Sequence, residues 1–152
     1  MPKPRESEFF KTGKEISNFK ATDINGNKIN IKELKGKIVV LNFWFINCPP
    51  CRKEIPELNE MVNDYKDSTN IVFLGVANDY KEELQEFLKN NPFDYTIIDN
   101  GRYIAGKYSI RSFPTNVILD KAGHVYFHSS GLGAWTVTWL RKSIEELLAN
   151  NY

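Results

Sequence analysis

The two cysteines of the chain, Cys48 and Cys51, enclose two prolines in the sequence Cys-Pro-Pro-Cys. An apolar run over 38–45 precedes them, and a helical pattern follows from about Arg52. The two thiols are therefore expected where a buried strand ends and a helix begins. The free N–H groups of a first helical turn favour a thiolate over a thiol. In such C-x-x-C sites the thiol pKa falls from about 8.5 to about 3.5–7.5, so this placement predicts thiol-disulfide exchange.

The positions of the two cysteines suggest different roles. We expect Cys48 to cap the helix, face solvent and act as the nucleophile. Cys51 lies three residues into the helix, where it would be partly covered and act as the resolving thiol. Pro49 and Pro50 are tolerated because first-turn N–H groups have no intrahelical partner. They also remove two donors, so the N–H and thiol of Cys51 should matter more for stabilising the Cys48 thiolate.

A structural disulfide and a zinc site are the two other uses that a cysteine pair could have. A structural disulfide closing so short a loop would gain little loop-closure entropy. A zinc site would need His124 and His128, the only histidines, which lie far beyond the usual finger spacing. We expect both histidines to be surface residues on a strand. Stoichiometric zinc in the reduced protein would favour the metal site.

Length and composition narrow the class of protein. The 152 residues suggest one domain with a full core, and 41% hydrophobic and 13% aromatic residues exclude a disordered chain. A net charge of +1 argues against nucleic acid or an anionic membrane as the main partner. No apolar run approaches the roughly 20 residues of a membrane span. The N-terminus lacks the apolar region of a signal peptide, which does not settle the compartment.

Hydrophobic periodicity predicts the elements that hold the cysteine pair. We expect a flexible lead-in over 1–15 and a single domain over 16–152. The fold class is α/β, with a mixed central sheet and helices on both faces. Pro56 should kink the first helix. The expected elements are a hairpin (19–23 and 28–31), a helical turn (31–34), strands at 37–45, 71–77, 94–98, 115–119 and 124–129, and helices at 49–65, 81–89, 103–108 and 135–149.

Several motifs together resemble the thioredoxin fold, and more closely the TlpA-like family of thiol-disulfide oxidoreductases. The resemblance covers residues 16–150. It implies a thioredoxin-like fold with an N-terminal β-hairpin and an inserted βα element. The motifs, in chain order, are a strand followed by Trp44, Asn47 and Cys48-Pro49-Pro50-Cys51, a helix containing Pro56, and Phe113-Pro114-Thr115 before a hairpin.

The resemblance further implies a cis Phe113–Pro114 bond facing the cysteines. The backbone before the proline would then pair with an incoming peptide strand. We expect Phe113 to lie in the groove for that strand, and Trp44 to be partly core. The predicted groove residues are Trp44, Pro49, Pro50, Phe113, Pro114 and Thr115.

Glu54 lies three residues after Cys51, on a similar face of the helix. In TlpA-like proteins a glutamate here is linked to proton transfer, and it could accept the Cys51 proton. A solvated helix glutamate is the alternative.

Two residues depart from the patterns of thioredoxin-like proteins. Asn47 replaces a common tryptophan and makes the rim more polar. Asn42 aligns with the buried acid of thioredoxin and is expected to be a core hydrogen-bonding residue.

The expected reaction needs no metal or organic cofactor, only the redox-active pair Cys48–Cys51. A protein disulfide is the expected substrate, an upstream thiol reductant restores the dithiol, and the chain is expected to be monomeric. The resemblance implies a reductant, cytochrome c biogenesis, and a periplasmic or other extracytoplasmic compartment. An anchoring segment outside this sequence would fit that compartment. A cytoplasmic location remains the alternative.

Two other activities occur on folds of this kind and remain alternatives for this chain. A peroxiredoxin-like thiol peroxidase would resemble proteins with Thr or Ser three residues before the reactive cysteine, where this chain has Phe45. A copper or haem-maturation chaperone would usually use C-x-x-x-C with a histidine, and the spacing here is shorter.

Overall fold

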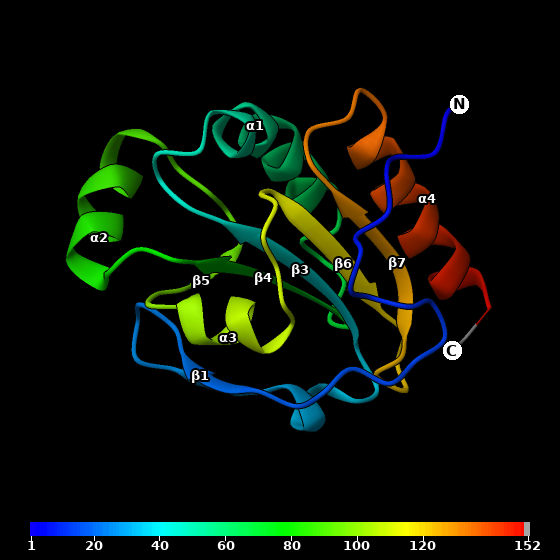
Figure 1. Ribbon diagram of the computed structural model, residues 1–152. Helices are drawn as coiled ribbons and strands as arrows, with labels where there is room; N and C mark the ends of the chain where they lie inside the picture. Colours follow the sequence, from blue (N-terminus) through cyan, green and yellow to red (C-terminus); the bar gives the residue numbers. More distant parts are fainter. Residues whose placement is uncertain (151–152) are drawn as a thin grey trace.

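Strand β3 (Ile38–Trp44), which leads to the cysteine pair, lies in the middle of a five-stranded sheet of order β5-β4-β3-β6-β7 (Figure 1). The computed structural model describes residues 1–150. Strands β3, β4 and β5 are parallel, whereas β6 is antiparallel to both β3 and β7. Every residue of β3 is buried, as its unbroken apolar sequence predicts for a strand covered on both faces.

The other elements follow the order expected from the sequence. An antiparallel hairpin and a short 3-10 turn, η1, precede β3, and α2 and β5 are the extra helix and strand after the βαβ unit. Pro56 lies inside α1. The bounds are β1 (Lys20–Thr22), β2 (Lys28–Asn30), η1 (Ile31–Leu34), α1 (Pro49–Asp64), β4 (Ile71–Ala77), α2 (Lys81–Asn90), β5 (Thr96–Ile98), α3 (Arg102–Lys107), β6 (Thr115–Leu119), β7 (Val125–Ser130) and α4 (Thr136–Ala149).

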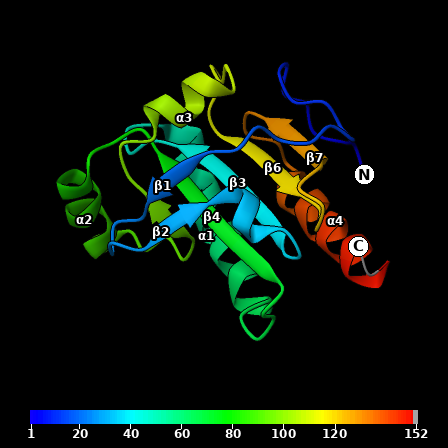
Figure 2. The same cartoon turned by 90° about the horizontal axis from the view of Figure 1, so that it is seen from below.

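Two apolar clusters cover the two faces of the sheet. On one face, α1, α2 and α4 contribute buried residues such as Leu58, Leu84 and Ile144. On the other face, the hairpin region and α3 contribute residues such as Phe19 and Ile104. Figure 2 shows the hairpin and α3 on the side of the sheet opposite α1. The prediction of a mixed sheet with helices on both faces is confirmed, and the element boundaries differ from those expected by one or two residues.

The first fifteen residues, expected to be a flexible lead-in, run beside β7 (Figure 1) and make defined contacts with it. The N–H of Gly13 donates to the carbonyl of Val125, and the N–H of Ser130 donates to the carbonyl of Arg5. Phe10 enters the core between these two points and is 8% exposed. The lead-in therefore covers the outer side of β7. The domain boundary at residue 16 stays a prediction, and residues 151–152 lie outside the described residues.

His128 is buried beneath this lead-in, so the prediction that both histidines are surface residues is wrong for it. Its side chain is 3% exposed, and its Nδ1 accepts a hydrogen bond from the N–H of Ser7 at 3.1 Å. Burial lowers the pKa of His128. His124 remains partly exposed. His128 lies on β7, whereas His124 precedes the strand and forms an isolated bridge with Glu15 of the lead-in.

Two glycines of the α3 region should respond in opposite ways to alanine. A Cβ on Gly101 would lie 2.5 Å from Val76 Cγ1 and 2.9 Å from the carbonyl oxygen of Ala77, whereas a Cβ on Gly106 meets no atom within 4 Å. We expect Gly101→Ala to lower the free energy of unfolding by about 1–3 kcal/mol. Gly106→Ala, inside the helix, should raise it by about 0.5–1 kcal/mol. Urea unfolding of the oxidised proteins measures both, and equal effects would contradict the close approach at Gly101.

Candidate active site

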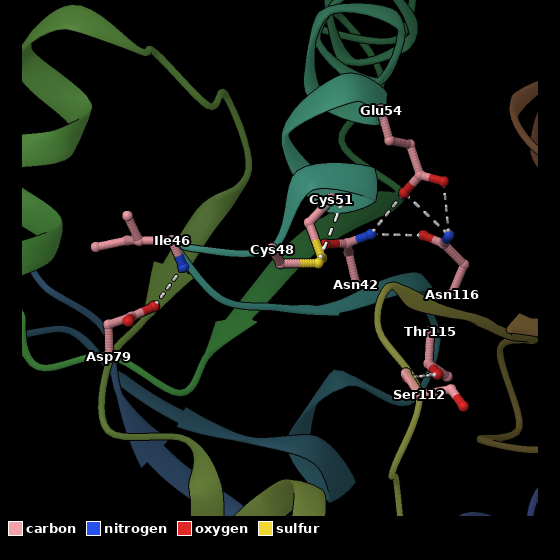
Figure 3. The surroundings of a disulfide bond; sticks show 9 residues. All are labelled: Asn42, Ile46, Cys48, Cys51, Glu54, Asp79, Ser112, Thr115 and Asn116. Carbon is pink, nitrogen blue, oxygen red and sulfur yellow. Dashed lines mark hydrogen bonds between the residues drawn. A yellow bond between two sulfur atoms is a disulfide. The ribbon is translucent and has the colours of Figure 1, made fainter. Parts of the chain in front are cut away.

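Cys48 and Cys51 form a disulfide at the N-terminus of α1 (Figure 3). Cys48 is the N-cap residue, and its Sγ accepts a hydrogen bond from the N–H of Cys51 at 3.3 Å. Pro49 and Pro50 occupy the first helical positions, where a missing N–H costs no intrahelical bond. The predicted cap is confirmed, and the Cys51 N–H lies where it can stabilise charge on Cys48.

The prediction that Cys48 faces solvent is wrong for the disulfide form. Cys48 and Cys51 are each 2% exposed, and both belong to the apolar cluster that contains Ile55. In the disulfide form both cysteines pack against that cluster. Pro49 is exposed and Pro50 is half-buried. The prolines therefore form the outer surface of the motif.

Trp44 is a core residue, which corrects its expected place in the groove. Its side chain is 0% exposed, with ring centroids 5.9 Å from Phe87 and 5.1 Å from Phe93. Its ring therefore packs against both α2, through Phe87, and the segment that follows α2, through Phe93. It cannot line a surface groove in this arrangement.

The peptide bond between Phe113 and Pro114 is cis, as the resemblance implies. Phe113 is half-buried, and its ring packs edge-on against Phe45 at a centroid distance of 5.3 Å. Pro114 is buried. The hydroxyl of Thr115, a residue 1% exposed, donates to the carbonyl of Ser112 at 2.7 Å (Figure 3). The groove roles of Pro49, Pro50, Phe113, Pro114 and Thr115 stay predictions.

Glu54 is buried in a hydrogen-bonded network, so the alternative of a solvated glutamate is wrong. Its side chain is 3% exposed. Asn42 Nδ2 donates to Glu54 Oε1 at 3.0 Å, and Asn116 Nδ2 donates to Oε1 at 3.1 Å and to Oε2 at 3.4 Å (Figure 3). Asn42 Nδ2 also donates to Asn116 Oδ1 at 2.8 Å. Asn42 is thus the core hydrogen-bonding residue expected from the sequence.

Burial raises the pKa of Glu54 to about 7. The hydrogen bonds from Asn116 and Asn42 oppose this effect because they favour the charged carboxylate, and the charge of Glu57 adds slightly to the rise. A group with such a pKa can both accept and release a proton near neutral pH.

Asp79 supports the segment between β3 and Cys48, and sequence reasoning missed it. Its Oδ2 accepts a hydrogen bond from the N–H of Ile46 at 2.8 Å (Figure 3). Burial raises the pKa of Asp79, and the bond from Ile46 partly offsets that rise. The only sequence signal was its position two residues beyond β4, at the same end of the sheet as the cysteines.

Asn116 was also missed, although a signal existed. Asn42 is the polar residue of the otherwise apolar strand β3, and Asn116 follows Thr115 on β6. The strand register sets the two asparagines directly opposite each other. Buried polar groups are almost always hydrogen-bonded, so each of these amides needs polar partners.

Within residues 1–150, no three His, Cys, Asp or Glu side chains gather as metal ligands would. No helix in that range has the length and apolar character of a membrane span. The chemistry that the described residues bring together is a dithiol pair on a helix N-terminus with a titratable carboxyl one turn later.

Comparisons with known proteins match this chemistry. The model of the AhpC/TSA family matches residues 12–128. The thiol-disulfide oxidoreductase ResA of Bacillus cereus is 39% identical over 121 residues, covering 79% of this chain and 70% of that protein. The protein of the same name from Halalkalibacterium halodurans is 32% identical over 124 residues, covering 80% and 70%.

Solved structures show the same fold. The thioredoxin domain of a thiol-disulfide oxidoreductase from Bacteroides vulgatus superposes with a TM-score of 0.75 at 25% identity, over 88% of this chain and 97% of that domain. The expected thioredoxin-like fold is confirmed.

Proposed function

Because the chain belongs to the AhpC/TSA family and is a TlpA-like thiol-disulfide oxidoreductase, we propose that it reduces disulfide bonds in client proteins. The observation that carries this proposal is the Cys48–Cys51 pair at the start of α1. The Cys51 N–H donates to Cys48 Sγ, so Cys48 is the sulfur whose thiolate the helix terminus stabilises.

The reaction runs in two exchange steps. The Cys48 thiolate attacks one sulfur of the client disulfide, and the other client sulfur leaves as a thiolate. Cys51 then loses its proton and attacks Cys48, which forms the Cys48–Cys51 bond and releases the second client sulfur. The client gains two electrons and the dithiol loses them. An upstream thiol reductant returns the pair to the dithiol.

Glu54 is the proposed acceptor for the Cys51 proton. It lies one helical turn after Cys51, on the buried side of α1 that Cys51 also occupies. Its pKa of about 7 suits transfer to and from a thiol at neutral pH. No other carboxyl of α1 is buried within the described residues.

The proposed setting is outside the cytoplasm, as a monomer. Protein disulfides form and persist in oxidising compartments, and a reductant of such bonds acts where its clients are found. The resemblance to TlpA-like proteins supports this setting. It also supports cytochrome c biogenesis as one process that could supply clients.

The resolving step gives a direct test. Reduced Cys51→Ser protein, mixed with a disulfide-bonded model protein such as insulin, should accumulate a mixed disulfide through Cys48, because no second thiol can release the client. Mass spectrometry of the adduct, before and after dithiothreitol, measures it.

Cys48→Ser is the matched control, since it removes the same intramolecular disulfide but leaves the proposed resolving thiol. Equal trapping by the two variants would contradict the assignment of the nucleophile. A reduction potential near that of a strong oxidant, about −120 mV, would instead reverse the proposed direction.

A further inference from the structure

The buried carboxyl of Glu54 is held by two side chains from neighbouring strands, not by its own helix. Asn42 lies on β3 and Asn116 lies opposite it on β6. Asn42 is 2% exposed and Asn116 is 0% exposed. Figure 3 shows both amides directed toward Glu54 from the sheet. The three side chains therefore form a closed polar cluster inside an apolar core, joining α1 to the middle of the sheet.

The hydrogen bonds to the carboxyl favour its charged form and oppose the effect of burial. Both Glu54 oxygens receive amide N–H donors, at distances of 3.0–3.4 Å. The oxygen of Asn116 accepts from Asn42, so the amide nitrogen of Asn116, and not its oxygen, is directed at the carboxyl. A carboxylate can accept all of these bonds through the lone pairs of its two oxygens, whereas protonating one oxygen removes part of that acceptor capacity.

We propose that Asn42 and Asn116 are positioning residues of the exchange reaction, which hold the Glu54 carboxylate charged and correctly oriented until it takes the proton from Cys51. This inference rests on the proposed role of Glu54. The amides need not touch the reacting sulfurs, because they act through the carboxylate. When the proton arrives, Glu54 becomes neutral and Cys51 becomes the thiolate that attacks Cys48, so proton and charge balance.

The cluster balances two opposing effects on Glu54. Burial alone favours the neutral acid, which could not accept a proton. The two amides restore enough preference for the charged form to leave the group titrating near neutral pH. Removing either amide should therefore leave Glu54 protonated over a wider pH range and slow the step that needs its charged form.

The first measurement follows Glu54 itself, without any thiol chemistry. In the oxidised protein, the Glu54 carboxyl carbon is titrated by NMR. We expect Asn116→Leu and Asn42→Leu, which keep the side-chain shape and remove the donors, to move the midpoint up by about 1–2 pH units each. Ser129→Ala is the matched control. Ser129 is 0% exposed and lies opposite Asn116 on β7, and no hydrogen bond joins it to Glu54.

A second pair of variants keeps the test decisive if the leucine variants do not fold. Asn116→Thr and Asn116→Val have nearly equal volumes, suit a strand, and differ in one hydroxyl donor. The midpoint for Asn116→Val should lie above that for Asn116→Thr. An unmoved midpoint in every folded variant would overturn the inference and leave the oxidoreductase activity untouched.

The second measurement follows the exchange step. The pH profile for resolution of a preformed mixed disulfide on Cys48 should shift upward in Asn116→Leu. In Glu54→Gln the inflection of the pH profile that is attributed to Glu54 should vanish. Adding Asn116→Leu to Glu54→Gln should then cause no further shift of the profile. A role in stability alone would lower the unfolding free energy and leave this profile in place.

The two measurements separate the possible failures. If the midpoint of Glu54 moves but Glu54→Gln keeps the native pH profile, both the proton role and the positioning role are wrong. If the unaltered protein fails to reduce the model client, the proposed function fails, whereas the NMR titration still reports whether the amides hold the carboxylate.

Discussion

Replacing Cys48 by serine is expected to reduce dithiol-driven cleavage of a protein disulfide to the uncatalysed background. The Cys48 sulfur is the helix N-cap and accepts the Cys51 N–H, so it is the group that the structure prepares as a thiolate. A serine hydroxyl in its place does not ionise near neutral pH and cannot form a disulfide with the client. The turbidity or fluorescence of insulin reduction, followed with excess dithiothreitol, measures the rate.

Two variants serve as controls for this loss. Cys51→Ser breaks the same intramolecular bond but keeps Cys48, and it should still react once with a client. Asn47→Ala changes the exposed neighbour of Cys48 and should keep a rate close to the native one. If Cys48→Ser retained a tenth or more of the catalysed rate, Cys48 would not be the nucleophile.

The second large effect concerns stability and pH. The folded pKa of Glu54 is about 7, above the ordinary value of 4.5 expected in the unfolded chain. Between these values the folded protein binds more protons, so its stability is greatest below pH 4.5 as far as this group is concerned. That stability is lost as the pH rises through about 7, and the loss approaches about 3 kcal/mol above pH 8.

Glu54→Gln should remove this dependence, because glutamine keeps the shape and carries no charge. Between pH 5 and pH 8 we expect the stability of the variant relative to the native protein to rise by about 2–3 kcal/mol. Urea unfolding of the oxidised proteins across this range measures the difference. Glu57→Gln, an exposed position on the same helix, is the control and should be nearly neutral at both pH values. A Glu54→Gln effect that did not change with pH would contradict the raised pKa.

Such a result would explain why a charged group is kept in the core. A buried carboxylate costs stability at the pH where it must accept a proton, so this result would favour a role of Glu54 in the reaction over a role in the fold. The prediction is therefore paired: as the pH rises, Glu54→Gln should gain stability relative to the native protein, and it should impair the proposed resolving step.

The sequence predicted most of the fold because local signals were strong. The apolar run that forms β3 favours a strand covered on both faces, and the hairpin expected over 19–23 and 28–31 is the pair β1 and β2. The cap at Cys48 was predictable because the cysteine pair lies between the apolar run and the helical pattern.

What failed depended on distant parts of the chain. Trp44 and Cys48 are more buried than expected because the cluster of α1, α2 and the segment after α2 closes over them. Helical periodicity showed which side of α1 Glu54 shares with Cys51, but not that two amides from the sheet would meet it there. Asn116 becomes visible only through the register of β3 with β6.

The contact of the lead-in with β7 has a consequence for the sheet as a whole. β7 is an edge strand, and an uncovered edge offers unpaired backbone groups to a second molecule. The backbone groups of Val125 and Ser130 bond to Gly13 and Arg5 of the lead-in. Between these two points Phe10 packs into the core. Shortening the chain before residue 16 would open this edge to intermolecular pairing. We therefore expect the first residues to protect the domain against aggregation, although they lie outside its regular elements.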